Sequence, residues 1–362
     1  MSGNYCIPSM KEIEEIKRNG FNVASTFSGC GGSCLGYKMA GYNVLYANEF
    51  IPEAQKTYLS NFKNTYLDKR DIREIKAQEI LKICNLKKYE LDILDGSPPC
   101  ASFSTAGKRE KHWGEIKNYS DTKQRTDDLF FEYIRILRGI MPKVFVAENV
   151  KGLTIGKAKG MFKEFMKAME ESGYNVLAQI INAMYLGVPQ SRERVIFIGV
   201  RKDLNILPPK IKPKEKIITI GQALKGVSND KSEIDYLNES IKKYKIYEIA
   251  QRMPKNPKKR MSASKIMDGS YFNLIRESMY NPCSTICQMV GCESASGNLH
   301  PLYDRKFTTS ELKRLSSFPD DFILTGSFRK KCERIGRAVP PLMMYNVSKT
   351  IEKEVLKKYD KR

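Results

Sequence analysis

The sequence predicts an α/β fold built on an open sheet with helices on both faces, accompanied by a smaller domain of irregular structure. Between residues 21 and 203, short apolar runs alternate with stretches of helical periodicity, and this alternation is typical of a parallel sheet. After residue 204 prolines cluster, and the periodicity stays weak as far as residue 304. We therefore expect one domain made of residues 1–203 and 305–362, and a second made of residues 204–304.

The apolar runs and helical patterns locate the individual elements. Strands are expected at Phe21–Phe27, Val44–Ala47, Leu91–Leu94, Val144–Ala147, Asn175–Asn182 and Arg194–Val200. Helices are expected around Cys34–Met39, Pro52–Asn61, Asp127–Gly139 and Met161–Ser172. A helical pattern returns at Thr308–Ser316, and a double proline opens a last helix at Pro340–Leu356.

The composition limits the class of protein. Lys and Arg number 62 against 41 Asp and Glu, a net charge of +21, which favours a polyanionic partner, either a nucleic acid or an anionic membrane surface. Genomic lysine bias accounts for part of this excess, but not for its local clusters. No apolar run reaches the ~18 residues of a membrane span, and the start of the chain lacks the apolar centre of a signal peptide. Nine irregularly spaced cysteines indicate reduced thiols, so we expect a cytoplasmic protein, associated with the nucleoid.

The most informative stretch follows the apolar run Leu91–Leu94. Pro98 and Pro99 each fix φ and remove a backbone donor, so the strand must end there, and Cys100 follows on a stiff turn. Ligands of open α/β sheets bind at the carboxyl ends of the strands. A buried and inert thiol is the alternative. Because Cys100 comes after the strand rather than inside it, we interpret it as a nucleophile.

A glycine-rich loop after the first strand predicts a cofactor site. The loop, residues 27–32, opens a helix whose N-terminus favours negative charge, and its glycines allow close approach of a ligand. Glu49 comes 20 positions after Gly29 and directly after the second strand, where a carboxylate can accept from ribose hydroxyls. Asp71 and Ile72 suit an adenine ring. These features favour an adenosine cofactor over turn glycines and a solvated acid. They do not separate NAD from S-adenosylmethionine, although the compact loop favours a nucleoside without phosphates.

Three further residues fit one reaction with Cys100. Glu148 directly follows the strand Val144–Ala147, and Arg192 and Arg194 directly precede the next predicted strand. A thiolate that adds to C6 of cytosine makes C5 nucleophilic toward a methyl group. The addition requires a carboxylic acid that protonates or hydrogen-bonds N3 and an arginine that stabilises the charge at O2. Taken singly, Glu148 could be a helix cap, and the arginines could be surface partners of Glu193.

The chain resembles the cytosine-C5 DNA methyltransferases. The resemblance rests on ordered blocks of sequence: Phe27-Ser-Gly-Cys-Gly-Gly, Asn48-Glu-Phe, Asp71-Ile, Gly96-Ser-Pro-Pro-Cys-Ala-Ser-Phe-Ser, Leu129-Phe-Phe-Glu, Glu148-Asn-Val, Gln190-Ser-Arg-Glu-Arg, Arg305-Lys-Phe-Thr-Thr-Ser-Glu-Leu-Lys-Arg-Leu-Ser-Ser-Phe-Pro-Asp and Arg334-Ile-Gly-Arg-Ala-Val-Pro-Pro. It implies a Rossmann-like, S-adenosylmethionine-dependent catalytic domain and a target-recognition domain at residues 204–304. Members of the family flip the target base out of the duplex.

The resemblance also implies the roles of individual residues. Cys100 would be the nucleophile. Glu148 would contact N3 and N4 of the target cytosine, Arg194 would contact its O2, and Arg192 would lie near its phosphate. The residues implied around S-adenosylmethionine are Phe27, Gly29, Gly31, Gly32, Glu49, Phe50, Asp71, Ile72, Pro99, Leu129, Arg337 and Ala338. On DNA we expect Ser104, from the cysteine block, and, from the local positive charge alone, Lys258, Lys259 and Arg260 of the basic run Lys255–Arg260.

Two positions depart from the family pattern. Ala101 replaces the usual glutamine after the cysteine, and Arg337 replaces the usual asparagine of the last block. A cation beside a sulfonium is unfavourable. Arg337 must therefore either turn to a phosphate or an acidic neighbour, or compensate a carboxylate on the cofactor, as in carboxy-S-adenosylmethionine. In the second case the product would be 5-carboxymethylcytosine.

The region 204–304 does not reveal a recognition sequence. Its basic run, with Tyr271 and Phe272, suits a surface that follows phosphates, although a solvated lysine loop is the alternative. The spacing of Cys283, Cys287, Cys292 and His300 matches no common zinc pattern, so no metal is expected.

The leading hypothesis is a DNA cytosine-C5 methyltransferase that acts as a monomer on double-stranded DNA, away from any membrane. A cognate restriction endonuclease, where one exists, would act separately. Alternatives are the carboxymethyltransferase, a tRNA cytosine-C5 methyltransferase, and a DNA-binding module without catalysis. Intact Cys100, Glu148 and Arg194 oppose the last. A dehydrogenase would leave Cys100 and the basic charge unexplained.

Overall fold

The computed structural model of the protein describes residues 5–99, 117–119, 122–124, 128–213, 216–267, 271, 273–288 and 296–360. The chain forms two compact units. Unit 1 comprises Met1–Glu14, Asn182–Arg192 and Pro213–Met343, and unit 2 comprises Glu15–Ile181, Glu193–Lys212 and Met344–Arg362. These limits follow the compactness of the structure, whereas the boundaries expected at 203/204 and 304/305 rest on proline content and periodicity and stay a prediction.

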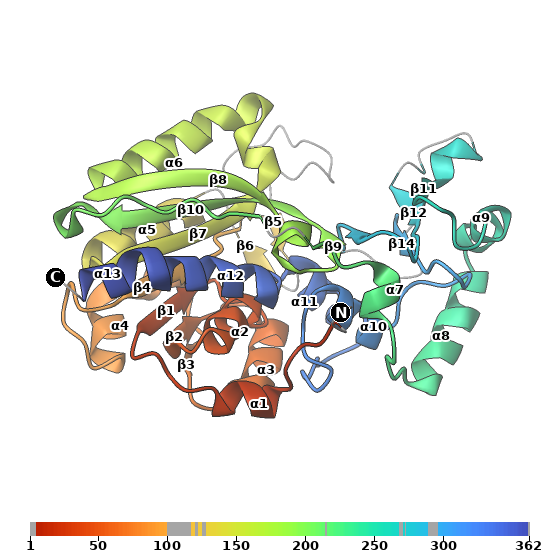
Figure 1. Ribbon diagram of the computed structural model, residues 1–362, viewed down its shortest axis with the longest axis horizontal. Coiled ribbons are helices and arrows are strands. Elements are labelled where there is room, and N and C mark those ends of the chain that lie inside the picture. Colours follow the sequence, from red (N-terminus) through yellow and green to blue (C-terminus); the bar gives the residue numbers. More distant parts are fainter. Residues whose placement is uncertain are drawn as a thin grey trace. The chain divides into compact units, whose positions relative to one another are not determined.

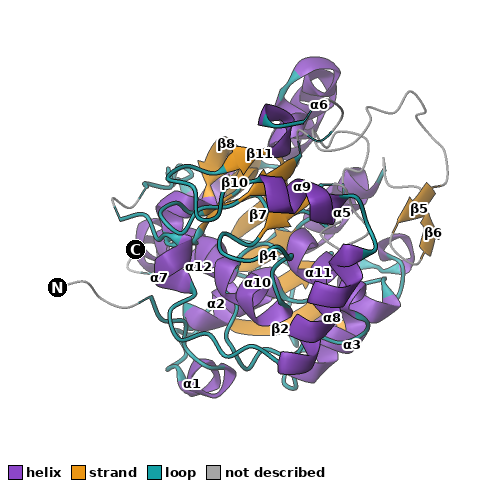
Figure 2. Ribbon diagram, turned by 90° about the vertical axis from the view of Figure 1, so that its right-hand side faces the viewer, coloured by secondary structure: helices purple, strands orange, loops and turns teal. Residues whose placement is uncertain are grey.

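Unit 2 is built on a seven-stranded sheet in the order β3-β2-β1-β4-β7-β10-β8 (Figures 1 and 2). Its strands are β1 (Asn22–Thr26), β2 (Asn43–Asn48), β3 (Tyr66–Asp68), β4 (Ile93–Gly96), β7 (Val144–Val150), β8 (Tyr174–Asn182) and β10 (Glu193–Arg201). A separate antiparallel pair joins β5 (Lys117–Tyr119) to β6 (Thr122–Gln124). The α/β class is confirmed and all six predicted strands are present, although the one expected at Leu91–Leu94 runs from Ile93 to Gly96.

The prediction of a parallel sheet is correct only for part of unit 2. Strands β3, β2, β1, β4 and β7 pair in parallel, but β10 is antiparallel to β7, with Ile196 opposite Glu148. Only residues 183–192 separate β8 from β10, and short connections join antiparallel rather than parallel strands. The reversal places the beginning of β10 beside the carboxyl end of β7.

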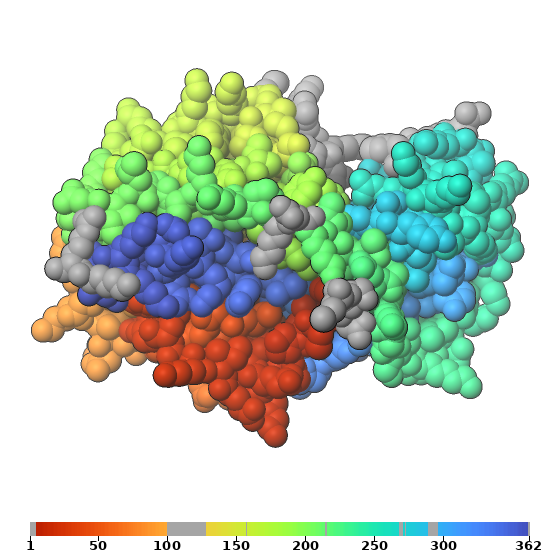
Figure 3. Space-filling view, viewed as in Figure 1, coloured from red at the N-terminus to blue at the C-terminus, as the bar shows by residue number. Residues whose placement is uncertain are grey.

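Helices cover both faces of this sheet. They are α2 (Gly32–Met39), α3 (Pro52–Asn61), α4 (Ala77–Ile83), α5 (Leu129–Ile140), α6 (Lys159–Glu171), the C-terminal part of α12 (Pro341–Ile351) and α13 (Lys357–Tyr359). All four residues of β4 are buried, as are six of the seven in β7, which is the pattern of strands covered on both faces. In Figure 3, Met344–Asp360 (blue) lies beside the red and orange N-terminal segments of the same unit, and the Tyr42 hydroxyl donates to the Ser348 carbonyl at 2.9 Å.

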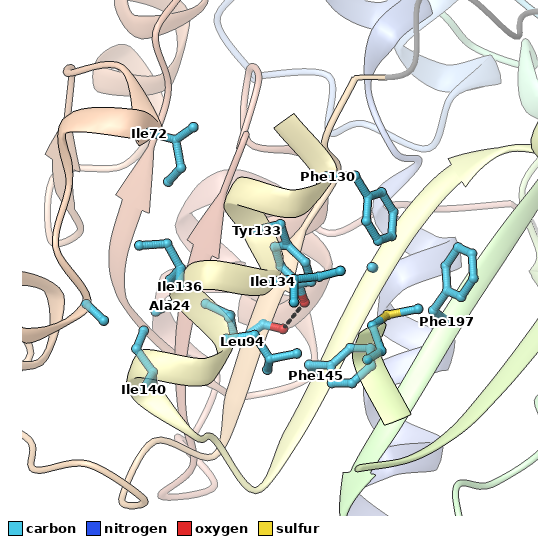
Figure 4. Packing of buried hydrophobic residues seen from close by; sticks show 14 of the residues in the cluster. Ala24, Ile72, Leu94, Phe130, Tyr133, Ile134, Ile136, Ile140, Phe145 and Phe197 are labelled. Carbon is cyan, nitrogen blue, oxygen red and sulfur yellow. Dashed lines mark hydrogen bonds between the residues drawn. The ribbon is translucent and has the colours of Figure 1, made fainter. Parts of the chain in front are cut away.

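Helix α5 shows how sequence periodicity builds the core. Its residues Phe130, Tyr133, Ile134 and Leu137 recur at the spacing of one helical face, and all are buried. Figure 4 shows this face directed at Leu94, Phe145 and Phe197 on three neighbouring strands. The Tyr133 hydroxyl donates to the Leu94 carbonyl at 3.1 Å and to the Val146 carbonyl at 3.2 Å, so β4 and β7 are fixed to the same side chain.

Unit 1 has short strands and several helices. The helices are α1 (Met10–Glu15), whose last residue belongs to unit 2, α7 (Ile220–Ala223), α8 (Lys231–Lys242), α9 (Ile246–Arg252), α10 (Thr309–Leu315) and α11 (Phe328–Arg337). The strands are β9 (Gln190–Ser191), β11 (Met261–Ser262), β12 (Leu274–Arg276), β13 (Cys283–Ser284) and β14 (Gly297–Leu299). The short strands agree with the expected irregularity, but α8, α9 and α11 were not predicted. The helices expected at Thr308–Ser316 and Pro340–Leu356 are confirmed as α10 and as α12 with its extension to Leu356.

Candidate active site at the carboxyl edge of the sheet

The glycine loop and Glu49 meet at the carboxyl ends of β1 and β2, as their spacing predicts. The Gly29 amide donates to Glu49 Oε2 at 2.7 Å, and the Ile51 amide donates to Oε1 at 2.7 Å. Phe27, directly after β1, has a positive φ of 54° and contacts the core. Each carboxylate oxygen can accept more than one hydrogen bond, so Glu49 retains acceptor capacity for a ligand.

Gly31 cannot be replaced without moving the loop. Its φ of +92° lies in the left-handed region, and a Cβ there would lie 2.1 Å from the Phe62 ring. The Gly31 amide donates to the Ser28 carbonyl at 2.9 Å, and Gly32 begins α2. The loop therefore turns tightly into the N-terminus of the helix.

Asp71 and Ile72 follow β3 at the same edge of the sheet. Asp71 accepts from the Arg73 amide at 3.0 Å and from the Arg73 guanidinium at 2.8 Å, and the same guanidinium bonds Asp128 at 2.7 Å, immediately before Leu129. Ile72 and Leu129 are buried in the main core cluster, and Phe50 is half-buried. The sequence prediction did not include Arg73, which fixes the orientation of the Asp71 carboxylate.

The Pro-Pro turn is held to both neighbouring strands. A Cβ on Gly96 would lie 2.5 Å from the Tyr133 ring and 2.7 Å from Thr26 Oγ1, so only glycine fits at the end of β4. The Asn149 side chain donates to the Pro98 carbonyl at 3.2 Å, which ties the turn to β7. Pro99 is the last described residue before the gap, and Cys100 and Ser104 lie outside the described residues.

Glu148 and Arg194 form an ion pair at this edge. Arg194 Nε lies 2.8 Å from Glu148 Oε1, and the exposed fractions of their side chains are 15% and 11%. Glu193 pairs instead with Lys151 at 2.9 Å. The interpretation of Glu148 as a helix cap and Arg194 as a carboxylate partner of Glu193 is therefore wrong. Glu148 lies within the end of β7, since that strand continues to Val150.

Arg192 belongs to unit 1, although it is only two residues from Arg194. Its side chain is buried, and its guanidinium donates to the Ile286 carbonyl at 3.2 Å. The preceding strand β9 pairs in parallel with β13. Arg192 is thus fixed against the segment that follows β13, and its role near a phosphate stays a prediction.

Arg337 and Ala338, at the end of α11, also belong to unit 1. Arg337 Nε lies 3.0 Å from Glu333 Oε1, one helical turn earlier, and Arg334 Nη2 lies 2.9 Å from the same oxygen. The Ala338 amide donates to the Arg334 carbonyl at 3.1 Å. The sequence left three possible partners for Arg337: a phosphate, an acidic neighbour or a carboxylate on the cofactor. In the structure its partner is an acidic neighbour, Glu333.

The basic run lies on the surface of unit 1. Lys258, Lys259 and Arg260 are all exposed and directly precede β11. The start of the run is anchored because the Asn256 amide donates to the Pro301 carbonyl at 2.8 Å. Tyr271 packs against an apolar cluster instead of joining the exposed run, and Phe272 lies outside the described residues. Among the described residues, no group of three His, Cys, Asp or Glu is arranged to hold a metal ion, and Cys292 lies outside them.

Comparison with known proteins settles the family. The profile of C-5 cytosine-specific DNA methylases matches residues 21–353. The chain belongs to this family. It is thereby classed as an S-adenosylmethionine-dependent DNA cytosine methyltransferase. No helix in the described part of the chain is long and apolar enough to cross a membrane.

The similar proteins include bacterial Type II methyltransferases. The chain is 32% identical to M.FnuDI of Fusobacterium nucleatum, over 93% of this chain and 97% of the relative. It is 30% identical to M.NgoPII of Neisseria gonorrhoeae, over 95% and 99%.

Solved structures share the fold at lower sequence identity. One is described as a DNA modification methyltransferase encoded within an E. coli prophage, with a TM-score of 0.69, 22% identity, and coverage of 93% of this chain and 99% of that one. Another is a mutant of Spodoptera frugiperda DNMT2, with a TM-score of 0.66, 16% identity, and coverage of 92% and 100%.

Proposed function

We propose that the protein methylates C5 of cytosine in double-stranded DNA through a covalent bond between Cys100 and C6. The observation that carries this proposal is the largely buried Glu148–Arg194 pair at the sheet edge where β4 leads into Pro98, Pro99 and Cys100. Asn149, the neighbour of Glu148, holds the Pro98 carbonyl, so the pair and the turn are linked by one short segment of β7.

Each residue has a defined task in this reaction. The Cys100 thiolate forms a bond to C6 of the flipped base, and the ring electrons move toward C5, N3 and O2. Glu148 hydrogen-bonds N3 and N4, Arg194 stabilises negative charge at O2, and Arg192 binds the phosphate of the target nucleotide. Ser104, Lys258, Lys259 and Arg260 contact the DNA.

The residues at the ends of β1, β2 and β3 fit the methyl donor. Glu49 has acceptor capacity for ribose hydroxyls, and Asp71, oriented by Arg73, can accept from an adenine amino group. Phe27, Phe50, Ile72 and Leu129 supply apolar surface at the same edge. S-adenosylmethionine held there would supply an electrophilic methyl group for C5. Loss of the C5 proton to solvent water, together with breakage of the Cys100–C6 bond, would restore the ring double bond and the thiolate.

The biological partner is proposed from the relatives. Type II methyltransferases such as M.FnuDI and M.NgoPII support a sequence-specific modification enzyme in a restriction-modification system. We propose a cytoplasmic monomer, with any endonuclease acting separately. A tRNA substrate is less supported, because M.FnuDI and M.NgoPII, at 32% and 30% identity, are Type II methyltransferases.

Transfer of a carboxymethyl group is also less supported. It would need Arg337 to compensate a carboxylate on the cofactor, and Glu333 already lies 3.0 Å from this guanidinium. Mass spectrometry of nucleosides from DNA treated with each cofactor separates the two reactions: 5-methylcytosine supports the proposal, and 5-carboxymethylcytosine contradicts it.

The decisive experiment uses Cys100→Ser and DNA containing 5-fluorocytosine. The wild-type protein should methylate cytosine, detected by bisulfite sequencing, and should be trapped on the fluorinated DNA because fluorine at C5 blocks the elimination. Cys100→Ser should bind DNA but neither turn over nor form the adduct, because a hydroxyl is a far poorer nucleophile. Cys6→Ser, at an exposed cysteine, is the control and should behave as wild type. An adduct with Cys100→Ser would remove Cys100 from its role.

A further inference from the structure

A buried carboxyl group, that of Asp95, takes no part in the reaction outlined above. Asp95 is the third of the four residues of β4 and is 2% exposed. The Ser25 hydroxyl donates to its Oδ2 at 2.9 Å, and the Tyr37 hydroxyl donates to its Oδ1 at 3.4 Å. The carboxyl group therefore accepts hydrogen bonds from two different elements of unit 2.

These two elements flank the glycine loop. Ser25 lies on β1, which leads into the loop, and Tyr37 lies on α2, which follows it. The Ser28 hydroxyl, inside the loop, donates to the Ser25 carbonyl at 3.2 Å and lies 3.1 Å from Ser25 Oγ. On the other side, Asp95 is followed by Gly96, where the strand ends and the turn toward Cys100 begins. The side chain of Asp95 thus connects the cofactor loop to the strand of the catalytic turn.

We propose that Asp95 is a positioning residue for methyl transfer, which holds the glycine loop in register with the strand that leads to Cys100. It acts through Ser25 and Tyr37 and does not touch the reacting atoms. The proposal rests on the proposed function, since it assigns the loop to the methyl donor and the turn to the nucleophile. In-line transfer requires donor and acceptor to be placed within a fraction of an ångström, and a small displacement is costly in rate.

The surroundings of Asp95 make an ionised carboxylate unfavourable. Burial raises its pKa to about 7, the Ser25, Ser33 and Tyr37 hydroxyls act against this rise, and the Glu148 carboxyl adds to it. The titratable groups that interact with it from the packed elements are Cys34 and Tyr37 on α2, Tyr58 on α3, Tyr133 on α5 and Glu148 on β7. Among the described residues this set contains no cation.

This environment has a cost in stability with a defined sign. The native pKa lies above the ordinary value of 3.8, so between about pH 4 and pH 7 the folded protein retains a proton that the unfolded chain has lost. The contribution of Asp95 to stability therefore falls as pH rises through this window and stays low above it. A neutral residue of the same shape avoids the cost, so a purely structural role would be filled better by asparagine.

The test compares Asp95→Asn with Asp92→Asn. Asp92 immediately precedes β4, is also buried, accepts from the Asn22 amide at 2.7 Å, and pairs with Lys143 at 2.9 Å. It is therefore a matched carboxyl group at the opposite end of the same strand. Affinity for S-adenosylmethionine is measured by calorimetry from pH 5.5 to 8.5, together with single-turnover methyl transfer and thermal unfolding.

Asp95→Asn should unfold at the same or a higher temperature than wild type at pH 8, yet transfer methyl about tenfold to a hundredfold more slowly. Wild-type affinity for S-adenosylmethionine should strengthen as pH rises through about 7, because the ionised carboxylate accepts both hydroxyl bonds more strongly. This pH dependence should be absent from Asp95→Asn and kept by Asp92→Asn.

Wild-type affinity and pH dependence in Asp95→Asn would overturn the proposal. If that variant does not fold, Ser25→Ala and Tyr37→Phe each remove one hydrogen bond to the carboxyl group and should each weaken cofactor binding; unchanged binding in both would again overturn it. A wild-type protein that binds S-adenosylmethionine but methylates no cytosine would contradict the proposed function, while the affinity comparison would still decide the role of Asp95.

Discussion

One set of buried charged side chains in each unit shows a difference between the two units. In unit 2, Glu49, Glu148 and Asp95 lie at the carboxyl ends of strands whose interiors are apolar. In unit 1, charged side chains are buried in the interior itself. Arg276, with no exposed surface, donates to the His300 carbonyl at 2.8 Å, the Tyr303 carbonyl at 2.6 Å and the Ala250 carbonyl at 2.6 Å.

This difference teaches what holds each unit together. Unit 2 gains its stability from apolar layers between sheet and helices, and its charged groups at the strand ends are not part of the core cluster. Unit 1 has strands of only two or three residues, and the buried Arg276 guanidinium links carbonyls of α9 and of the segment after β14. The buried side chains of Arg276, Arg305 and Glu311 in unit 1 therefore support the fold, whereas Glu148, at the sheet edge of unit 2, is proposed to serve the reaction.

The largest expected effect tests this statement in unit 1. Arg305 and Glu311 form a bidentate pair, both bonds being 2.8 Å, and the two residues are 3% and 2% exposed. Glu311→Gln leaves a buried guanidinium without its carboxylate and should cost about 3–5 kcal/mol in the free energy of unfolding. The control is Glu239→Gln, whose exposed pair with Lys242 should make no measurable difference. Chemical denaturation measures both, and equal stabilities would break the comparison.

The same pair predicts a pH dependence. Burial acts to raise the pKa of Glu311, but the hydrogen bonds and charge of Arg305, the His300 imidazole and the Thr308 amide together outweigh it, and the pKa is lowered from its ordinary value of 4.5. The stabilisation is therefore present above about pH 4.5 and is lost as pH falls through the lowered pKa. Unfolding of wild type and Glu311→Gln should differ at pH 7 and converge toward strongly acid pH.

The next effect tests the sheet edge of unit 2. Glu148→Gln should lower the single-turnover rate of methyl transfer by ~10²-fold, the usual scale for a positioned acid, with a much smaller change in stability than Glu311→Gln. Glu193→Gln is the neighbouring control, because that carboxylate pairs with Lys151 and is half exposed. A near-normal rate in Glu148→Gln would show that its ion pair with Arg194 is structural.

A smaller effect concerns the exposed charges of unit 1. Neutralising Lys258, Lys259 and Arg260 should weaken DNA binding at all sequences and reduce the slope of log affinity against log salt by about 1 for each DNA phosphate that is no longer neutralised. Fluorescence anisotropy at several salt concentrations measures the slope. Neutralising Lys163 and Lys167 on α6 gives a control of equal sign in unit 2. An unchanged slope in the first variant would make the basic run a solvated surface.

The smallest effect is expected at Arg337. Since Glu333 lies 3.0 Å from this guanidinium, Arg337→Asn should leave the preference for S-adenosylmethionine over carboxy-S-adenosylmethionine unchanged. Competition between the two cofactors, read by mass spectrometry of the product nucleosides, measures it. A variant that loses carboxymethyl transfer present in wild type would revive that alternative.

The sequence could predict the sheet of unit 2 because strands covered on both faces appear as apolar runs, and the helices between them bury one face. Strand β3 was not predicted, because a strand of three residues is too short to show an alternating pattern. In unit 1, α8 buries Leu237 and Ile241, four residues apart, but the charged residues around them weaken this signal. Glu333 could have been found, since it precedes Arg337 by one helical turn.

The sequence could predict which site residues lie at the ends of strands, but not which side chains they pair with. Gly29 and Glu49 meet because each follows a strand of one parallel pair. The ion pair of Arg194 with Glu148 depends on β10 running antiparallel to β7 in one register, and no local pattern specifies that register. In the sequence, Asp95 directly follows an apolar run. Only the structure shows that its carboxyl group accepts hydrogen bonds from the Ser25 and Tyr37 hydroxyls.

The pairing of β9 with β13 has a consequence for protein engineering. Besides the ladder between Gln190 and Cys283, the Thr285 hydroxyl donates to the Ser191 carbonyl at 2.8 Å, and the Ile286 amide donates to Gln190 Oε1 at 3.2 Å. A chimera that exchanges only the expected target-recognition domain, residues 204–304, between two such enzymes would pair β9 of one enzyme with β13 of the other and could not keep all of these contacts. Grafts intended to change the target sequence should therefore transfer two segments together, Asn182–Arg192 and Pro213–Met343.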